Sequence, residues 1–364
     1  MGLRQLIFRF VVWASNKFSS RPEKERVFTA LEKIYRGIEN GKESKGIVIP
    51  FDCNQGRFII FSDQHKGAKN GADDFMLCEP AYLAALDFYY QQNFQFITLG
   101  DCEELWENSL SRVLAQQKPS FERYRKFVAQ ARMHKTIGNH DLDWKNNPLA
   151  IAQIKSIFGG DLSIYDGILL KTTIHDRELK ILCTHGHQGD KASDGNWFSK
   201  FFVSKIWAPL QILLKINPNT PAYDAQLKTL HNNLMYEWSL GHSNMLVITG
   251  HTHQPVFESL THLERLYRRL LWARANNKEE LIKETEAEIQ KRKFEYNSIS
   301  NDYLTLKPTY FNAGCCCYND GDITGIEIED GCLRLVKWIA KGDVPKRQVL
   351  EEEKLEDLLQ AIQP

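Results

Sequence analysis

The heptapeptide KTIGNHD, residues Lys135–Asp141, is the stretch from which the fold of this 364-residue chain can be reconstructed. A short apolar run leads into Gly138, and the next three residues carry side chains that can bind a metal ion or transfer a proton. On its own the tripeptide Asn-His-Asp is weak evidence, because it is also an ordinary turn sequence and chance matches are common. It gains weight because the same pattern recurs along the chain.

Four more apolar segments stop abruptly at an aspartate or a histidine. They are Phe58–Phe61 before Asp63 and His65, Phe96–Leu99 before Asp101, Ile181–Cys183 before His185 and His187, and Leu246–Thr249 before His251 and His253. Short β-rich apolar runs bounded by glycine are typical of buried strands. Five such strands would place their polar ends along one edge of a sheet, where α/β folds bind ligands. We therefore expect the chemistry at that edge.

Helical patterns separate the first three of these strands. The spacing of apolar residues predicts a crossover helix over Glu79–Gln92 and another over Phe121–Met133. The order strand, helix, strand, helix, strand indicates an α/β fold. The catalytic domain is expected to span residues 47–342, with β patterns returning at Tyr310–Tyr318, Gly325–Glu329 and Leu333–Ile339.

Charge and cysteine content narrow the class of protein. The 46 basic and 46 acidic residues give a formal net charge of zero, so the chain lacks the basic footprint of a dedicated nucleic-acid binder. The eight cysteines show no paired zinc spacing, which favours a reducing, cytoplasmic location. The run Cys315–Cys317 is interpreted as packing rather than as a metal site.

Residues 1–46 are predicted to form amphipathic helices ahead of the domain. The first, within residues 1–18, is too short and too rich in arginine to span a bilayer, and it fits neither a signal peptide nor a myristoylation pattern. A basic, aromatic amphipathic helix can lie at the inner face of a membrane, or it can dock on its own domain or on a dimer partner. A second helix is predicted over Pro22–Asn40, with Gly41 as a stop.

Two insertions and a tail complete the outline. Residues 190–243 are dense in bulky apolar groups interspersed with lysines and are predicted to form a helical lid beside the site. Residues 258–298 have the pattern of a charged helical hairpin, which would be either a solvated ornament or an oligomer contact. Residues 343–364 are predicted to be an acidic tail with a surface helix over Glu351–Leu359.

The polar residues at the strand ends form a mixed set of oxygen and imidazole donors. The candidate metal ligands are Asp63, His65, Asp101, Asn139, His185, His251 and His253. Such a mixture suits Mn²⁺, Fe or Zn²⁺ better than Ca²⁺. Seven ligands are too many for one tetrahedral ion but fit two divalent ions that share a carboxylate. We expect a dinuclear centre, with Mn²⁺ favoured.

The motifs Asp-x-His, Gly-Asp, Gly-Asn-His-Asp, His-Gly and Gly-His-x-His, in this order and each after a strand, resemble the signature of the calcineurin-like metallophosphoesterases. The resemblance covers about Phe58–Cys317 apart from the insertions. It implies a β-sandwich flanked by helices and the hydrolysis of a phosphate mono- or diester or a pyrophosphate. The attacking group would be a metal-bound hydroxide.

Carried over by motif, the resemblance implies a role for each candidate. Asp63, His65 and His253 would hold one ion, Asn139, His185 and His251 the other, and Asp101 would bridge both. His187 is a rival to His185. His140 matches the family's non-ligand histidine and would stabilise the transition state or protonate the leaving group. Glu104 would either orient His140 or be a bare surface carboxylate, and Asp141 would support the loop.

The substrate is less constrained by the sequence. The stretch Gly100–Trp106, together with the apolar insertion, is similar to the UDP-2,3-diacylglucosamine pyrophosphatases of lipid A synthesis, which suggests an amphiphilic or lipid-linked phosphoester. The third motif of that branch resembles Gly-Asn-Arg-Asp, whereas this chain has His140 at the position of the arginine. Two other functions stay open, a nuclease of the same superfamily and a scaffold without catalysis. The neutral charge disfavours the first, and the complete ligand set disfavours the second.

Overall fold

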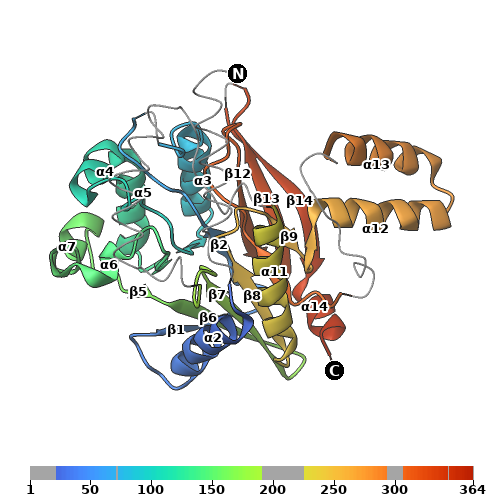
Figure 1. Ribbon diagram of the computed structural model, residues 1–364, viewed down its shortest axis with the longest axis horizontal. Coiled ribbons are helices and arrows are strands. Elements are labelled where there is room, and N and C mark those ends of the chain that lie inside the picture. The colour runs from blue at the N-terminus through green and yellow to red at the C-terminus, as the bar shows by residue number, and fades with distance from the viewer. Residues whose placement is uncertain (1–21, 71–72, 191–224, 293–305, 343, 364) are drawn as a thin grey trace.

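The protein folds as two mixed β-sheets packed face to face, with helices on their outer faces (Figure 1). The structure is a computed structural model and describes residues 22–70, 73–190, 225–292, 306–342 and 344–363. This four-layer arrangement is the α/β fold expected from the sequence, a β-sandwich flanked by helices.

The first sheet has seven strands in the order β1-β6-β7-β8-β11-β9-β10. Its strands are β1 (Gly46–Pro50), β6 (Gly167–Ile174), β7 (Arg177–Thr184), β8 (Met245–Thr249), β11 (Tyr310–Asn312), β9 (Val256–Phe257) and β10 (Leu260–Thr261). β7 and β8 run parallel, so their carboxyl ends lie at the same edge of the sheet.

The second sheet also has seven strands, in the order β14-β13-β12-β2-β3-β4-β5. Its strands are β14 (Lys346–Lys354), β13 (Cys332–Ile339), β12 (Ile323–Glu329), β2 (Phe58–Phe61), β3 (Gln95–Thr98), β4 (Met133–Thr136) and β5 (Ile164–Tyr165). β2, β3 and β4 are parallel neighbours, and β12 closes the other side of β2 in antiparallel pairing.

Strand β2 shows how the apolar runs build the layers. Its four residues are completely buried, and successive side chains of a strand point to opposite faces. Phe58 and Ile60 join the core between the two sheets, whereas Ile59 and Phe61 join the core under the helices. A strand buried on both faces has a continuous apolar sequence. That continuity explains why the strand-end motifs were visible in the sequence.

Helices cover both outer faces. The helices α3 (Glu79–Gln91), α4 (Leu110–Gln116), α5 (Lys118–Ala129), α6 (Asp143–Asn146) and α7 (Pro148–Phe158) lie on the side of the second sheet, and α2 (Lys24–Glu39) and α11 (Ala225–Leu240) lie on the first. None of the helices in the described ranges combines the length and the apolar character needed to cross a membrane.

Three expectations about the sheets are corrected by the structure. The five motif strands do not share one sheet edge, because β2, β3 and β4 belong to the second sheet and β7 and β8 to the first. Helix α5 ends at Ala129, since Met133 already pairs with Phe96 in the sheet. The strand expected over Tyr310–Tyr318 ends at Asn312, where the chain leaves β8 and turns toward β12.

The predicted insertions fall partly within the described residues. The helix expected near Pro22–Asn40 is present as α2, but the first amphipathic helix lies outside the described residues. Helix α11, predicted as part of a lid, packs Leu234 and Trp238 on the outer face of the first sheet and is a layer of the domain. A lid remains a prediction for residues 191–224, which also lie outside the description. The hairpin of α12 (His262–Ala275) and α13 (Glu279–Arg292) is present and projects from the body (Figure 1).

The expectation of an acidic tail with a surface helix over Glu351–Leu359 is wrong. Residues Lys346–Lys354 form β14, which pairs with β13 along its whole length, and the helix begins only at Leu355, as α14 (Leu355–Ala361). The glutamates mark an exposed edge strand, and Leu355, Leu358 and Leu359 are buried in the core between the sheets. The C-terminal segment is therefore part of the folded domain.

Candidate metal centre

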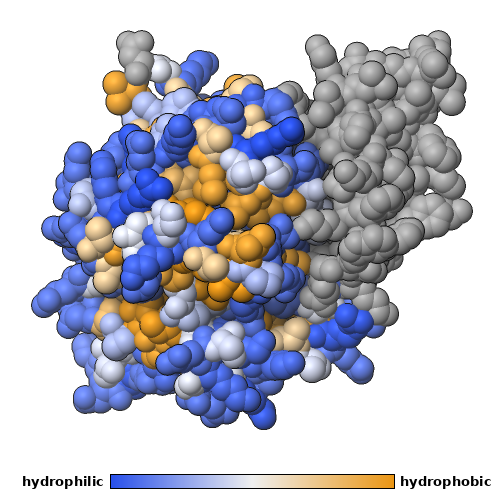
Figure 2. Space-filling view, turned by 90° about the vertical axis from the view of Figure 1, so that its left-hand side faces the viewer, coloured by the Kyte–Doolittle hydropathy of each residue, from blue (hydrophilic) through white to orange (hydrophobic). Residues whose placement is uncertain are grey.

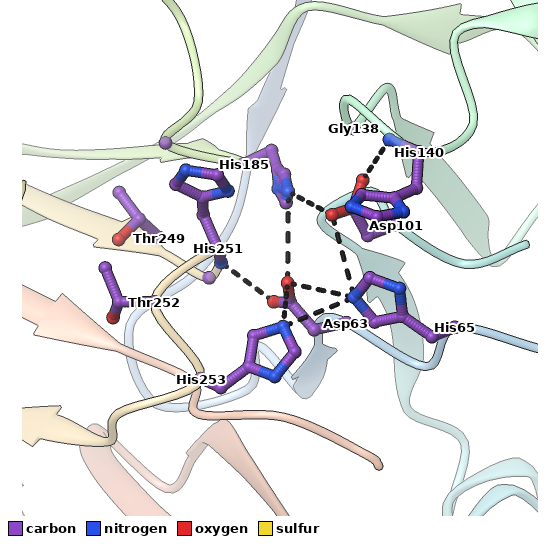
Figure 3. Close-up of polar contacts among 12 residues, drawn as sticks. Asp63, His65, Asp101, Gly138, His140, His185, Thr249, His251, Thr252 and His253 are labelled. Carbon is purple, nitrogen blue, oxygen red and sulfur yellow. Dashed lines mark hydrogen bonds and ion pairs between the residues drawn. The ribbon is translucent and has the colours of Figure 1, made fainter. Parts of the chain in front are cut away.

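The loops that follow five strands meet where the carboxyl ends of the two sheets face each other (Figure 3). β2, β3 and β4 supply the loops of Asp63, Asp101 and Asn139, and β7 and β8 supply those of His185 and His251. The site is thus built from both sheets. Because the strands within each group are parallel, their ends converge without any long excursion of the chain.

Two buried carboxylates form the centre of the site. The Oδ1 atom of Asp63 lies 3.2 Å from Nε2 of His253 and 3.9 Å from Nε2 of both His65 and His185. The Oδ2 atom of Asp101 lies 3.1 Å from Nε2 of His185 and 3.7 Å from Nε2 of His65. These side chains point toward one another (Figure 3). Both carboxylates thus face histidines from both sheets.

The backbone at this site adopts an uncommon conformation. Five candidate ligands have positive φ, namely Asp63 (53°), His65 (48°), Asp101 (49°), His251 (68°) and His253 (56°). Non-glycine residues rarely adopt this left-handed conformation, which costs energy and is concentrated at functional sites. This conformation recurs at five residues on three loops. The fold therefore keeps these side chains pointing into the site even though their backbone conformation is unfavourable.

Two glycines allow the loops to approach closely. A Cβ atom on Gly138 would overlap the amide nitrogen and Oδ1 of Asp101, and one on Gly250 would overlap Ser62 Oγ and Asp63 Oδ2. The space is used by hydrogen bonds, because His140 N donates to Asp101 Oδ1 at 2.8 Å and His251 N donates to Asp63 Oδ2 at 2.8 Å. Each carboxylate is thereby fixed by the backbone of another motif.

Glu104 is buried and lies between two histidines. Its Oε2 atom is 2.7 Å from Nδ1 of His140 and 2.9 Å from Nδ1 of His65. The surface alternative for Glu104 is therefore excluded. Trp106 completes the arrangement: its ring stacks on His140 with centroids 4.3 Å apart, and its Nε1 donates to the carbonyl of Asn139 at 2.6 Å. Sequence analysis missed Trp106, although it lies only two residues after Glu104.

Burial and neighbouring charges set the protonation of the site. Burial raises the pKa of Asp101 to about 7, although His140 and His65 act in the opposite direction. Burial alone would lower the pKa of His253, but Asp63 outweighs it and raises that pKa to about 9. In the other half of the site, burial lowers the pKa of His185 and His251 well below the usual value. Those two imidazoles are neutral near pH 7, as metal ligation requires.

Several buried polar atoms have no hydrogen-bond partner of suitable geometry among the described residues. They are Oδ1 of Asp63, Oδ1 of Asn139, both ring nitrogens of His185 and Nε2 of His251. Buried polar atoms are almost always paired, so such a concentration calls for a ligand. Carboxylate and amide oxygens together with imidazole nitrogens are donors that suit divalent transition metals. The residues present therefore fit a metal centre.

The structure separates the two histidines of the fourth motif. His185 contacts Asp101, whereas the ring of His187 lies beside that of His185, with centroids 5.1 Å apart. Asn139 is buried beside this group and is placed by its neighbour His140, whose amide holds Asp101. All the sequence-derived candidates are thus gathered at one site, with His187 beside it.

Thiols and a further histidine border the site and were not assigned to it from the sequence. All eight cysteines are free, and Cys315–Cys317 are buried as expected for packing residues. Cys317 Sγ is also 3.6 Å from Nδ1 of His253. His231 of α11 places its ring 5.1 Å from that of His251. Neither residue belongs to a strand-end motif, so the sequence carried no signal for them.

Comparison with known proteins agrees with this geometry. A family model described as calcineurin-like phosphoesterase matches residues 56–255, which include all five motif loops. A search of curated proteins returned no match.

Proposed function

Because the chain belongs to the calcineurin-like phosphoesterase family, we propose that it hydrolyses a phosphate mono- or diester or a pyrophosphate at a dinuclear metal centre between its two sheets. The observation that carries this proposal is the convergence of Asp63 and Asp101 with three buried histidines and the partly buried His253, because several polar atoms of this group have no hydrogen bond among the described residues.

The geometry supports the following division of ligands. Asp63, His65 and His253 would hold one ion, Asn139, His185 and His251 the other, and Asp101 both. The short contacts from Asp63 to His253 and from Asp101 to His185 support this grouping. Bound there, two divalent ions would polarise the phosphoryl oxygens and lower the pKa of a water molecule. Mn²⁺ is the ion we favour, with Fe and Zn²⁺ as alternatives of the same donor preference.

His140 is our candidate for the general acid. It is one-fifth exposed, so it can reach a substrate, while its Nδ1 faces the buried Glu104. The carboxylate of Glu104 and the stacked indole of Trp106 hold the imidazole ring in one orientation. Nε2 of His140 would then donate its proton to the departing oxygen of the ester.

We expect the substrate to be amphiphilic. The face formed by the helices of the second sheet carries apolar areas between polar ones (Figure 2). On this side α7 follows the Asn139 loop through α6, and its Leu149 and Ile151 are 71% and 49% exposed. The apolar segment 197–214, outside the described residues, agrees with this expectation. Exposed apolar side chains on this face could bind the acyl portion of a lipid-linked ester.

Metal analysis combined with hydrolysis tests the proposed reaction. The purified protein should carry about two transition-metal ions per chain, and chelation should remove its activity. Asp101→Ala should abolish hydrolysis, whereas Asp161→Ala, whose carboxylate is 90% exposed, should leave it unchanged. Full activity in protein freed of metal would overturn the proposal.

A substrate panel tests the amphiphilic expectation separately. The panel compares an aryl phosphomonoester, an aryl diester, a sugar-nucleotide pyrophosphate, a phospholipid and single-stranded DNA, with Mn²⁺ added. Leu149→Glu should lower kcat/KM for the lipid substrate and spare the aryl esters. Trp272→Glu, at an exposed site on the hairpin far from α7, is the matched control. Equal kcat/KM values for lipid and soluble esters would rule out an amphiphilic preference.

A further inference from the structure

Four charged residues form a buried cluster beneath the candidate metal centre. Lys66, Glu103, Lys135 and Asp141 are each at most 1% exposed, and their formal charges cancel. Nζ of Lys135 lies 2.9 Å from Oε2 of Glu103 and 3.3 Å from Oδ2 of Asp141, and Nζ of Lys66 lies 3.4 Å from Oε1 of Glu103. Lysine and glutamate are almost never fully buried unless they are paired. Such a cluster therefore needs an explanation.

Asp141 connects two of the metal loops through their backbones. Its Oδ1 accepts a hydrogen bond from Gly138 N at 2.7 Å, and its Oδ2 accepts one from Cys102 N at 2.9 Å. Gly138 immediately precedes Asn139, and Cys102 immediately follows Asp101. One carboxylate thus spans the loops of a proposed bridging ligand and a proposed terminal ligand. Lys135 neutralises this carboxylate from the end of β4.

Glu103 and Lys66 connect the third loop. Glu103 accepts hydrogen bonds from Lys135 and from the indole of Trp144, at 2.9 and 2.7 Å. Lys66 pairs with Glu103 as an isolated parallel bridge, and its amide donates to the carbonyl of Cys102 at 3.0 Å. Its Nζ also donates to the hydroxyl of Tyr124 at 2.8 Å. The ammonium group of Lys66 is therefore held by a hydroxyl group and by the charge of Glu103.

Three of the four members of the cluster adjoin a residue of the candidate site, and Lys135 lies on the strand that leads to Asn139. Lys66 follows His65, Glu103 precedes Glu104, and Asp141 follows His140. We propose that these four residues act as one positioning unit, which fixes the loops of Asp63, Asp101 and Asn139 relative to each other before metal binds. This inference rests on the proposed metal centre and adds residues that touch neither metal nor substrate. Loss of the unit would weaken the binding of both ions together.

A purely structural role is the competing explanation, and the chain offers a matched control. Glu327 is also completely buried, accepts hydrogen bonds from Tyr89, Arg334 and Arg347, and lies on β12 away from the five loops. Glu327→Gln removes a buried carboxylate charge from a comparable network. A structural role predicts the same behaviour for this variant and for Glu103→Gln.

The experiment measures the affinity for Mn²⁺ by titration of metal-free protein, together with the melting temperature. Glu103→Gln should lower the Mn²⁺ affinity about 10–100-fold, the effect typical of residues that orient metal ligands, whereas Glu327→Gln should keep it within about threefold. If Glu103→Gln does not fold, the double variant Glu103→Gln with Lys135→Met, which removes one charge of each sign, replaces it. Equal Mn²⁺ affinities in the Glu103 and Glu327 variants would overturn the positioning role.

Hydrogen exchange of metal-free protein gives a second readout that does not depend on the proposed function. The amides of Gly138 and Cys102 should exchange at least tenfold faster in Glu103→Gln than in Glu327→Gln. A wild-type protein that binds none of Mn²⁺, Fe and Zn²⁺ would refute the proposed function, and the exchange of these two amides would still decide the positioning role. If both amides exchange at the same rate in Glu103→Gln as in Glu327→Gln, the positioning role is refuted, whatever the affinity for metal.

Discussion

Nδ1 of His140 lies 2.7 Å from Oε2 of Glu104, which leaves Nε2 as the ring nitrogen that can face a substrate. This pair predicts a dependence on the leaving group. His140→Ala should lower kcat about 10²–10⁴-fold for an ester with a poor leaving group, and much less for an aryl ester, while the metal content stays unchanged. An equal loss for both esters would contradict a role as general acid.

The close approach at Gly250 predicts a loss of metal from a very small substitution. A methyl group there would displace Ser62 and the carboxylate of Asp63, so Gly250→Ala should reduce both bound metal and hydrolysis at least tenfold. At Gly241 the added Cβ would lie 3.4 Å from the carbonyl of Trp238, an ordinary contact, so Gly241→Ala should retain both. Metal analysis of the two purified variants distinguishes these outcomes. Normal metal content in Gly250→Ala would show that the loop can move to make room for the added methyl group.

The pH dependence of stability should contain a contribution from His134 on β4. Burial lowers its pKa to about 4, so the unfolded chain binds a proton at higher pH than the folded protein does. Above pH 6.5 this histidine is neutral in both the folded and the unfolded protein, so it does not reduce the free energy of unfolding. Stability then falls as the pH drops from 6.5 to 4, by about 3 kcal/mol at about 1.4 kcal/mol per pKa unit.

Denaturant unfolding at pH 7 and pH 4.5 measures this loss. His134→Gln, which retains a side chain able to contact Gln95, should lose less stability between these two pH values than wild type does. An identical loss in both proteins would assign the acid sensitivity to other groups.

The C-terminal helix should behave as part of the core. Leu358 is 1% exposed and packs between the sheets, so Leu358→Ala should cost about 2–5 kcal/mol of unfolding free energy. Leu271→Ala, at a 40% exposed position on the hairpin, should change stability by no more than about 0.5 kcal/mol. Thermal unfolding of both variants checks this contrast. A similar loss of stability in the two variants would show that the helix is not part of the core.

The sequence was informative about the site because the strands that lead into it are buried on both faces. Their continuous apolar runs end sharply at Asp63, Asp101 and His251, so the candidate ligands could be recognised without knowledge of the tertiary structure. The parallel order of β2, β3 and β4 also follows from the helices that separate them.

The rest depended on contacts between distant parts of the chain. The assignment of β7 and β8 to a different sheet from β2 is set by packing, which no local pattern encodes. The glutamates of β14 resemble a solvated tail, because an edge strand exposes one face and follows no helical spacing. Lys66 and Lys135 would be read as surface residues, and only the fold brings Glu103 to them.

The pairing of β2 with β12 bears on how the protein is made. Ile60, on the strand that leads to Asp63, pairs with Ile326, which leaves the ribosome long after Ile60 does. Until then one edge of this apolar strand has no neighbour, a state that favours aggregation and chaperone binding. We therefore expect metal uptake to follow the synthesis of β12, and a chain ending before Ile323 to acquire no metal. Maturation of the enzyme would then be limited by completion of its sheet rather than by the supply of ions.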